Sequence, residues 1–205
     1  AGKSPKDGSK TERKAGDNNA FSSLVFKTVA DPYAGKLTLF RVFSGSFKAD
    51  STIYNASKDT QERVGQIFLL QGKKQVPVPE IFEGDMGTVP KLKVTTTGDS
   101  LTDPANGILF DPIDFPKPVL SLALVPKTRG DEEKISNALA RLTEEDPSLT
   151  VERNAQTHEL LLSGLGQVHL DVAIERMKRR FGVEVDVKPP KVPYRETIRR
   201  KTKIQ

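Results

Sequence analysis

Residues 164–181 read Gly-Leu-Gly-Gln-Val-His-Leu-Asp-Val-Ala-Ile-Glu-Arg-Met-Lys-Arg-Arg-Phe, two glycines followed by an amphipathic pattern. Leu170, Ile174, Met177 and Phe181 are spaced four, three and four residues apart, so they share one face of a helix. The stretch therefore predicts a helix that begins near the glycines and packs this face into a core.

A second group of apolar residues, Leu165, Val168 and Val172, lies roughly opposite that core face. Two interpretations are open: the group covers the sheet edge of its own domain, or it docks another domain or molecule. His169, one of two histidines, is interpreted as structural because no nearby residue is a suitable relay partner.

The residues around this helix complete a β-α-β-β-α-β order. The predicted elements are a strand at 119–125, a helix from about 131 to 145, strands near 150–152 and at 159–162, the helix above, and a strand at 183–187. This order predicts a ferredoxin-like split βαβ domain, a four-stranded antiparallel sheet with both helices on one face. Many unrelated functions use that fold.

The first half of the chain has short period-two runs separated by turn signals, and no long helical window. The predicted strands lie at 24–29, 37–43, 52–54, 63–70, 87–89 and 108–109. They favour a closed antiparallel β-barrel of about six strands.

Composition divides the chain into four segments. Residues 1–20 are polar and predict a flexible connector, 21–115 form the barrel, and 116–190 form the ferredoxin-like domain after the stiff Pro116-Lys117-Pro118 boundary. Residues 191–205 are a basic exit segment, whose six cations and one carboxylate account for the whole net charge of +5. The rest of the chain is neutral, so RNA binding would need local patches.

Several chemistries find no support in the sequence. There is no cysteine, no GxxxxGK[ST] phosphate loop, no histidine pair with metal-ligand spacing and no long apolar run. Glu144-Glu145-Asp146 is interpreted as a solvated helix end, because no apolar neighbours would raise a carboxyl pKa. We therefore predict a soluble protein with no catalytic, cofactor-binding or metal-binding residues in this chain.

Seven blocks resemble translation elongation factor G in the order of that family. The blocks are 26–37 with 41–45, 95–101, 115–119, 126–128, 144–147, 164–171 and 194–198. The first blocks resemble the second domain of the family, and the later ones its third domain and exit.

The resemblance implies the middle part of a GTP-driven factor that moves messenger and transfer RNA through a bacterial or organellar ribosome. GTP and magnesium would be bound by a GTPase domain outside this chain, so the chain alone should not hydrolyse GTP. The implied partners are that GTPase domain and the small-subunit rRNA and proteins. We expect a cytoplasmic monomer that does not bind membranes.

The resemblance also implies three groups of site residues. Leu165, Gln167, Val168, His169 and Val172 would form an interdomain coupling surface. Pro116, Pro118 and His169 match positions that line the fusidic acid pocket. Candidates for RNA contact are Lys36, Arg41 and Lys48 on the barrel, with Arg176 and Arg180 on the helix flank.

Two departures from the family keep open a divergent paralogue that acts in ribosome protection or recycling. The family usually has Glu where this chain has Gln167, and residues 86–90 differ from its more apolar strand. A stand-alone RNA-binding module and an acylphosphatase-like hydrolase are also compatible with the sequence. The hydrolase would need an anion loop, for which Lys127-Thr128-Arg129-Gly130 is the nearest match.

Overall fold

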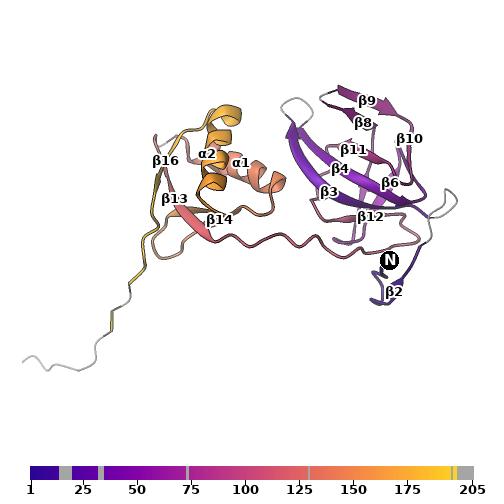
Figure 1. Ribbon diagram of the computed structural model, residues 1–205, viewed down its shortest axis with the longest axis horizontal. Helices are drawn as coiled ribbons and strands as arrows, with labels where there is room; N and C mark the ends of the chain where they lie inside the picture. The colour runs from indigo at the N-terminus through magenta and orange to yellow at the C-terminus, as the bar shows by residue number, and fades with distance from the viewer. Residues whose placement is uncertain (14–19, 32–34, 73, 129, 195, 198–205) are drawn as a thin grey trace, which may run out of the picture. The chain divides into compact units, whose positions relative to one another are not determined.

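The computed structural model describes residues 1–13, 20–31, 35–72, 74–128, 130–194 and 196–197. The chain passes from one compact unit to a second between Phe115 and Pro116. Figure 1 shows the strand-rich first unit in indigo to magenta and the second unit in orange to yellow.

The first unit is an antiparallel β-barrel, as predicted. Its described residues form an eight-stranded sheet, a strand pair in the N-terminal segment that is described below, and one further strand pair. In spatial order the sheet contains β7 (Thr60–Arg63), β6 (Thr52–Asn55), β12 (Ser100–Thr102), β3 (Ser22–Asp31), β4 (Gly35–Ser44), β11 (Met86–Pro90), β8 (Ile67–Gln71) and β9 (Lys74–Val78). The further pair is β5 (Ser46–Lys48) with β10 (Glu80–Phe82).

One apolar core fills the barrel. Alternate residues of β4, such as Phe40 and Val42, point inward and are fully buried, while Arg41 between them is exposed. The ring of Phe40 packs 4.4 Å from that of Phe47, centroid to centroid. This alternation is what the period-two pattern predicted.

Two barrel strands were wrongly predicted. Residues 63–70 form two strands, because β7 ends at Arg63, β8 begins at Ile67, and a segment containing Gly65 lies between them. Ile108–Leu109 is not a strand; Leu109 makes an isolated bridge with Lys3.

Gly87 of β11 is required by close packing. A Cβ atom there would lie 2.1 Å from Cδ1 of Ile81 and 2.9 Å from Cζ of Phe40. Pro90 takes the last paired position of β11, opposite Leu37, where the missing N–H costs least. The unusual composition of residues 86–90 is therefore compatible with this barrel.

The loop after β11 is held by a buried carboxylate. Glu62 accepts backbone N–H groups from Lys93 at 2.6 Å, Val94 at 3.0 Å and Thr95 at 3.0 Å, and also the hydroxyl of Thr95. Burial favours a raised pKa of Glu62, but these hydrogen bonds outweigh it and lower the pKa. The block at 95–101 thus has a structural role in the barrel.

The N-terminal segment differs from the predicted flexible connector. β1 (Gly2–Lys3) pairs with β2 (Lys10–Thr11), and Lys3 and Leu109 exchange two backbone hydrogen bonds of 2.7 Å. Main-chain pairing orders these polar residues where side-chain burial could not, so the prediction for 1–20 is wrong over 2–11. Residues 14–19 of the connector lie outside the described residues.

The second unit has the predicted split βαβ topology. Its elements are β13 (Leu120–Pro126), α1 (Glu132–Glu145), β14 (Thr150–Arg153), β15 (Leu160–Gly164), α2 (Gln167–Phe181) and β16 (Val185–Lys188). The sheet order is β14-β15-β13-β16, and every neighbouring pair is antiparallel. Both helices lie on one face of this sheet (Figure 1).

The helices form as their sequence patterns predict. Ile135, Leu139 and Leu142 of α1 are buried, as are Leu170 and Met177 of α2. Helix α2 ends at Gly182, whose positive φ of 65° suits glycine, with capping bonds to Lys178 and Met177 carbonyls. The exit segment contains no helix or strand among residues 191–194 and 196–197, and its remaining residues lie outside the description.

Candidate coupling and RNA-contact surfaces

A hydrogen bond between a side chain and the backbone holds the turn at the start of α2 in place. Nδ1 of His169 accepts the backbone N–H of Leu165 at 3.1 Å. An imidazole nitrogen accepts a hydrogen bond through its lone pair, so this contact uses the Nδ1 lone pair of His169. His169 therefore fixes the turn before α2, as expected for a structural histidine.

Gly164 lets this turn approach the helix. A Cβ on Gly164 would lie 2.9 Å from Leu170 Cδ2, 3.0 Å from His169 Nδ1 and 3.2 Å from Leu149 Cδ2. Gly166 has open space around it and an extended φ of 166°. Of these two glycines, only Gly164 is sterically required.

Three candidate coupling residues are exposed apolar side chains, and a fourth residue, Val119, is exposed near them in the chain's fold. Leu165 is 41% exposed, Val168 76% and Val172 38%, while Val119 is 80% exposed. Val119 is brought to this end of the sheet by its N–H, which donates to the Gly164 carbonyl at 2.9 Å. We call these four residues the α2 entrance patch. Their exposure shows that they are not used in their own domain's core.

Val119 was not predicted as part of this surface. In the sequence it is simply the first apolar residue of a strand, and nothing there shows its exposure. No sequence signal marks it, because Val119 lies just before β13, which begins at Leu120.

Gln167, the fifth coupling candidate, interacts within the helix. Its amide Nε2 donates to Asp171 Oδ1 at 2.8 Å, one turn further along. A Glu at this position would place two carboxylates four residues apart, which is unfavourable. The pair therefore provides a local physical reason for Gln at 167.

The candidates for an antibiotic pocket are partly brought together. Pro118 is half-buried beside Val119, and His169 lies at the same end of the sheet through its contact with Leu165. Pro116 is exposed two residues further along the chain.

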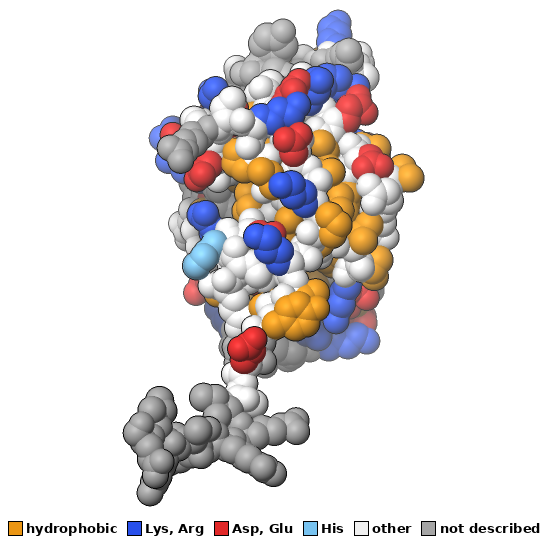
Figure 2. Space-filling model, turned by 90° about the vertical axis from the view of Figure 1, so that its left-hand side faces the viewer, with side chains coloured by type: hydrophobic (Ala, Val, Ile, Leu, Met, Phe, Trp, Pro, Cys, Tyr) orange, Lys and Arg blue, Asp and Glu red, His pale blue; other side chains and the backbone are white. Residues whose placement is uncertain are grey.

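The basic candidates on α2 lie together. Arg176 and Arg180 are four residues apart and exposed, so they share one helix flank. The guanidinium of Arg180 lies 5.6 Å from the ring centroid of Phe181, within cation–π range. On the face of the molecule that Figure 2 draws, acidic side chains lie among the basic ones.

The barrel candidates do not form one patch. Lys36 is half-buried near the start of β4, Arg41 is exposed in its middle, and Lys48 is exposed on β5 beyond its end. A strand advances about 3.3 Å per residue, so Lys36 and Lys48 belong to opposite ends of the barrel.

Residues considered for other chemistry make structural contacts instead. Lys127 Nζ is paired with Glu184 at 2.8 Å, and Thr128 Oγ1 donates to Asp131 at 2.6 Å. Arg129 lies outside the described residues. The ion pairs of Glu184 with Lys127 and Lys178 lower its pKa to about 2. These contacts leave no arranged anion loop among the described residues of this segment.

Two further kinds of site are absent from the described residues. No group of three or more His, Asp or Glu side chains among them is placed to hold a metal ion. Neither helix in this part of the chain is long and apolar enough to cross a membrane.

Comparison with known proteins agrees with this architecture. The family "Elongation factor G domain 2" matches residues 20–104, and "Elongation Factor G, domain III" matches residues 115–189. The crystal structure of a protein from Thermus thermophilus is similar, with a TM-score of 0.76 and 35% identity over 86% of this chain. This chain spans only 27% of that protein's length.

The β-barrel, the split βαβ domain and these matches define the class as multidomain translation elongation factors. Within that class, the chain belongs to the elongation factor G family, of which it contains the second and third domains.

Proposed function

We propose that this chain is the middle part of a cytoplasmic factor that promotes GTP-dependent movement of tRNA and mRNA on the ribosome. The presence of both family domains in their order supports this proposal. In it, GTP and magnesium are bound by a GTPase domain elsewhere in the full-length protein. The chain contributes ribosome contact and coupling between domains.

The observation that carries the coupling role is the α2 entrance patch. Val119, Leu165, Val168 and Val172 expose apolar surface beside a turn fixed by His169. Apolar surface of this kind is stabilised when another domain covers it. A domain that covers it in one nucleotide state and leaves it in another would shift the equilibrium between those states.

The proposed RNA contact uses the flank of α2. The guanidinium groups of Arg176 and Arg180 are exposed on one side of the helix and can form charge-assisted hydrogen bonds with phosphate oxygens. This contact would contribute affinity that falls with rising salt concentration.

The proposal also places the fusidic acid pocket near Pro116, Pro118 and His169, completed by the GTPase domain. Because His169 Nδ1 already accepts the Leu165 N–H, that nitrogen does not contact a ligand in this proposal. We therefore expect the 205-residue chain alone to bind fusidic acid weakly or not at all.

The decisive experiment compares Val168→Lys with Val192→Lys in the full-length protein. Val168 and Val192 are 76% and 65% exposed, so both variants should fold normally. We expect Val168→Lys to slow single-round translocation by roughly tenfold, equivalent to about 1.4 kcal/mol, and Val192→Lys to leave it unchanged. Equal rates for the two variants would contradict coupling through the patch. Loss of ribosome recycling with normal translocation would favour the divergent paralogue.

A further inference from the structure

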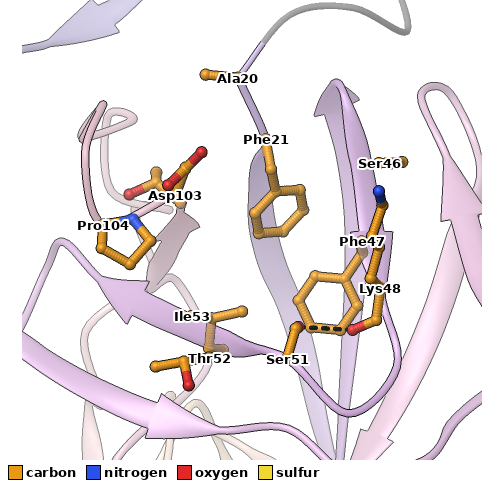
Figure 3. Close-up of a pocket in the computed structure, with 11 residues that line it drawn as sticks. Ala20, Phe21, Ser46, Phe47, Lys48, Ser51, Thr52, Ile53, Asp103 and Pro104 are labelled. Carbon is orange, nitrogen blue, oxygen red and sulfur yellow. Dashed lines mark hydrogen bonds between the residues drawn. The ribbon is translucent and has the colours of Figure 1, made fainter.

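A cavity of about 350 Å³ opens on the barrel and shares no residue with the α2 entrance patch (Figure 3). It lies where the start of β3, the β5–β6 connection and the segment after β12 meet. Its size falls within the range of small-ligand sites. We call it the Phe21 pocket.

The floor of the Phe21 pocket is apolar and partly aromatic. The ring centroids of Phe21 and Phe47 are 4.9 Å apart and the rings are tilted by 54°. Phe47 and Ile53 are buried at 1% and 2% exposure, while Phe21 is only partly buried. Figure 3 shows the Phe21 ring directed into the space between the walls. The pocket therefore offers a flat ring on which a planar group can stack.

Two charged side chains stand on opposite sides of this ring (Figure 3). The side chain of Lys48 is 68% exposed and its ammonium lies 3.7 Å from Glu80 Oε1, a weak surface ion pair. Across the pocket, Oδ1 of Asp103 accepts a long bond of 3.3 Å from the Ala105 N–H. An ionised carboxylate has about four acceptor positions, so Asp103 can accept further donors.

The backbone at the rim is held in place by Arg13. Its guanidinium donates to the carbonyls of Ala20 at 3.2 Å and Phe21 at 3.0 Å, and also to that of Asn106. These contacts tie the start of β3 to the segment after β12. The walls that carry Phe21 and Asp103 are therefore fixed relative to each other before any ligand binds.

One lining hydroxyl group is left without a partner. Oγ1 of Thr102 is buried and makes no hydrogen bond within the described part of the chain. By contrast, Ser51 Oγ donates to the Lys48 carbonyl at 2.7 Å, the dashed line in Figure 3. A buried hydroxyl without a partner is unfavourable, but Thr102 is 0% exposed, so this oxygen is not open to a ligand in the pocket.

We propose that the Phe21 pocket binds an unstacked guanine nucleotide of single-stranded RNA. The base stacks on Phe21, Asp103 accepts its adjacent N1–H and N2–H groups, and Lys48 contacts its phosphate. Adenine and cytosine present an acceptor beside their donor on this edge, which a carboxylate repels, and uracil presents one donor between two carbonyls. This proposal depends on the proposed function in one respect only: the proposed ribosome contact is what identifies the source of the RNA.

The test uses the 205-residue chain and labelled seven-nucleotide RNAs, followed by fluorescence anisotropy. The probes are UUUGUUU, UUUAUUU and U7. We expect UUUGUUU to bind roughly tenfold more tightly than the other two, a difference of about 1.4 kcal/mol. Asp103→Asn should remove this preference, because its amide donates where guanine also donates. Free guanosine monophosphate should bind more weakly than UUUGUUU, since it lacks the flanking phosphates.

Variants of the ring and the cation complete the test. Phe21→Leu should weaken binding of all three RNAs by roughly fivefold or more, while Phe21→Tyr, which keeps the ring, should not. Lys48→Ala should weaken all three equally, and Lys74→Ala, an exposed lysine of β9, serves as its control.

Two outcomes would overturn the proposal: equal affinity of the wild-type chain for the three RNAs, or a guanine preference that survives Asp103→Asn. Neither outcome affects the translocation test, which uses Val168 and the full-length protein.

Discussion

His169 and Leu165 are joined by a hydrogen bond in which Nδ1 of the imidazole accepts the backbone N–H at 3.1 Å. The bond links the first turn of α2 to the residue before Gly166. It therefore determines the position of Leu165, which belongs to the α2 entrance patch. His169 therefore helps to position the α2 entrance patch without being one of its four residues.

Removing this acceptor should loosen the turn. His169→Ala is expected to lower the free energy of unfolding of the second domain by about 1 kcal/mol. His169→Asn should lower it by less, because Oδ1 of Asn occupies nearly the position of Nδ1. Urea unfolding followed by circular dichroism measures both. Hydrogen exchange of the Leu165 amide gives a direct check, since unchanged protection in His169→Ala would contradict the bond.

Gln167→Glu should have almost no net effect on stability. A negative charge at the start of α2 gains about 0.3 to 1 kcal/mol from the helix dipole. The substitution also removes the hydrogen-bond donor to Asp171 and places two carboxylates one turn apart. Each of these two effects costs about 0.2 to 0.5 kcal/mol, so together they offset the gain.

A double-mutant cycle separates these contributions. In an Asp171→Asn background the repulsion is absent, so Gln167→Glu should become stabilising by about 0.5 kcal/mol. If the substitution has the same effect in both backgrounds, residues 167 and 171 do not interact.

Replacing Glu62 should destabilise the barrel. Glu62→Gln keeps one oxygen but turns an NH₂ group toward the donors of residues 93–95. The expected loss is about 1 to 3 kcal/mol, the cost of buried groups left without partners. Thermal unfolding of the variant, compared with that of Glu12→Gln at an exposed carboxylate, measures it.

Glu62 should also make the barrel sensitive to acid. Because folding lowers its pKa from the ordinary 4.5, its stabilising effect is complete above that value and is lost as pH falls through the lowered pKa. Wild-type stability should therefore decrease below about pH 4.5 more steeply than that of Glu62→Gln. Parallel pH profiles of the two proteins would contradict this assignment.

Gly87→Ala should destabilise the barrel by about 1 to 3 kcal/mol through overpacking. The new methyl group would lie 2.1 Å from Ile81 Cδ1. Ile81→Val removes that atom, so the double variant should recover part of the loss. Gly65→Ala, where the surrounding space is open, should be nearly neutral. Failure of Ile81→Val to compensate would point to Phe40 as the main obstacle.

The two helices could be predicted because their apolar spacing reflects burial directly. In α1 the apolar residues at helical spacing, Ile135, Ala138, Leu139 and Leu142, are all buried. The barrel's long strand β4 was also predictable, since it alternates between core and solvent from Thr38 to Ser44. Strand β3 departs from alternation at Phe26–Lys27, where a register shift interrupts its pairing with β4. Strands β5, β9, β10 and β12 were missed. Of these, β9 has Pro77 within it and polar residues at its start, features typical of an edge strand that periodicity does not reveal.

The surfaces were harder to predict than the fold. A sequence shows that Val168 is apolar but cannot show that Val119, almost fifty residues earlier, is beside the same turn. Likewise, Lys36, Arg41 and Lys48 are close in sequence, but strand geometry separates them along the barrel. The Phe21 pocket combines residues from three distant segments, so only the tertiary structure reveals it.

The path of the linker has a mechanical consequence. The chain enters the second domain directly into β13, which lies between β15 and β16 in the sheet. Tension applied through Pro116–Pro118 therefore acts first on an internal strand. Since the Val119 N–H is bonded to Gly164, that tension reaches the turn before α2 across a single hydrogen bond. The linker is therefore connected through one hydrogen bond to the turn that carries the α2 entrance patch, the surface through which we propose the domains communicate.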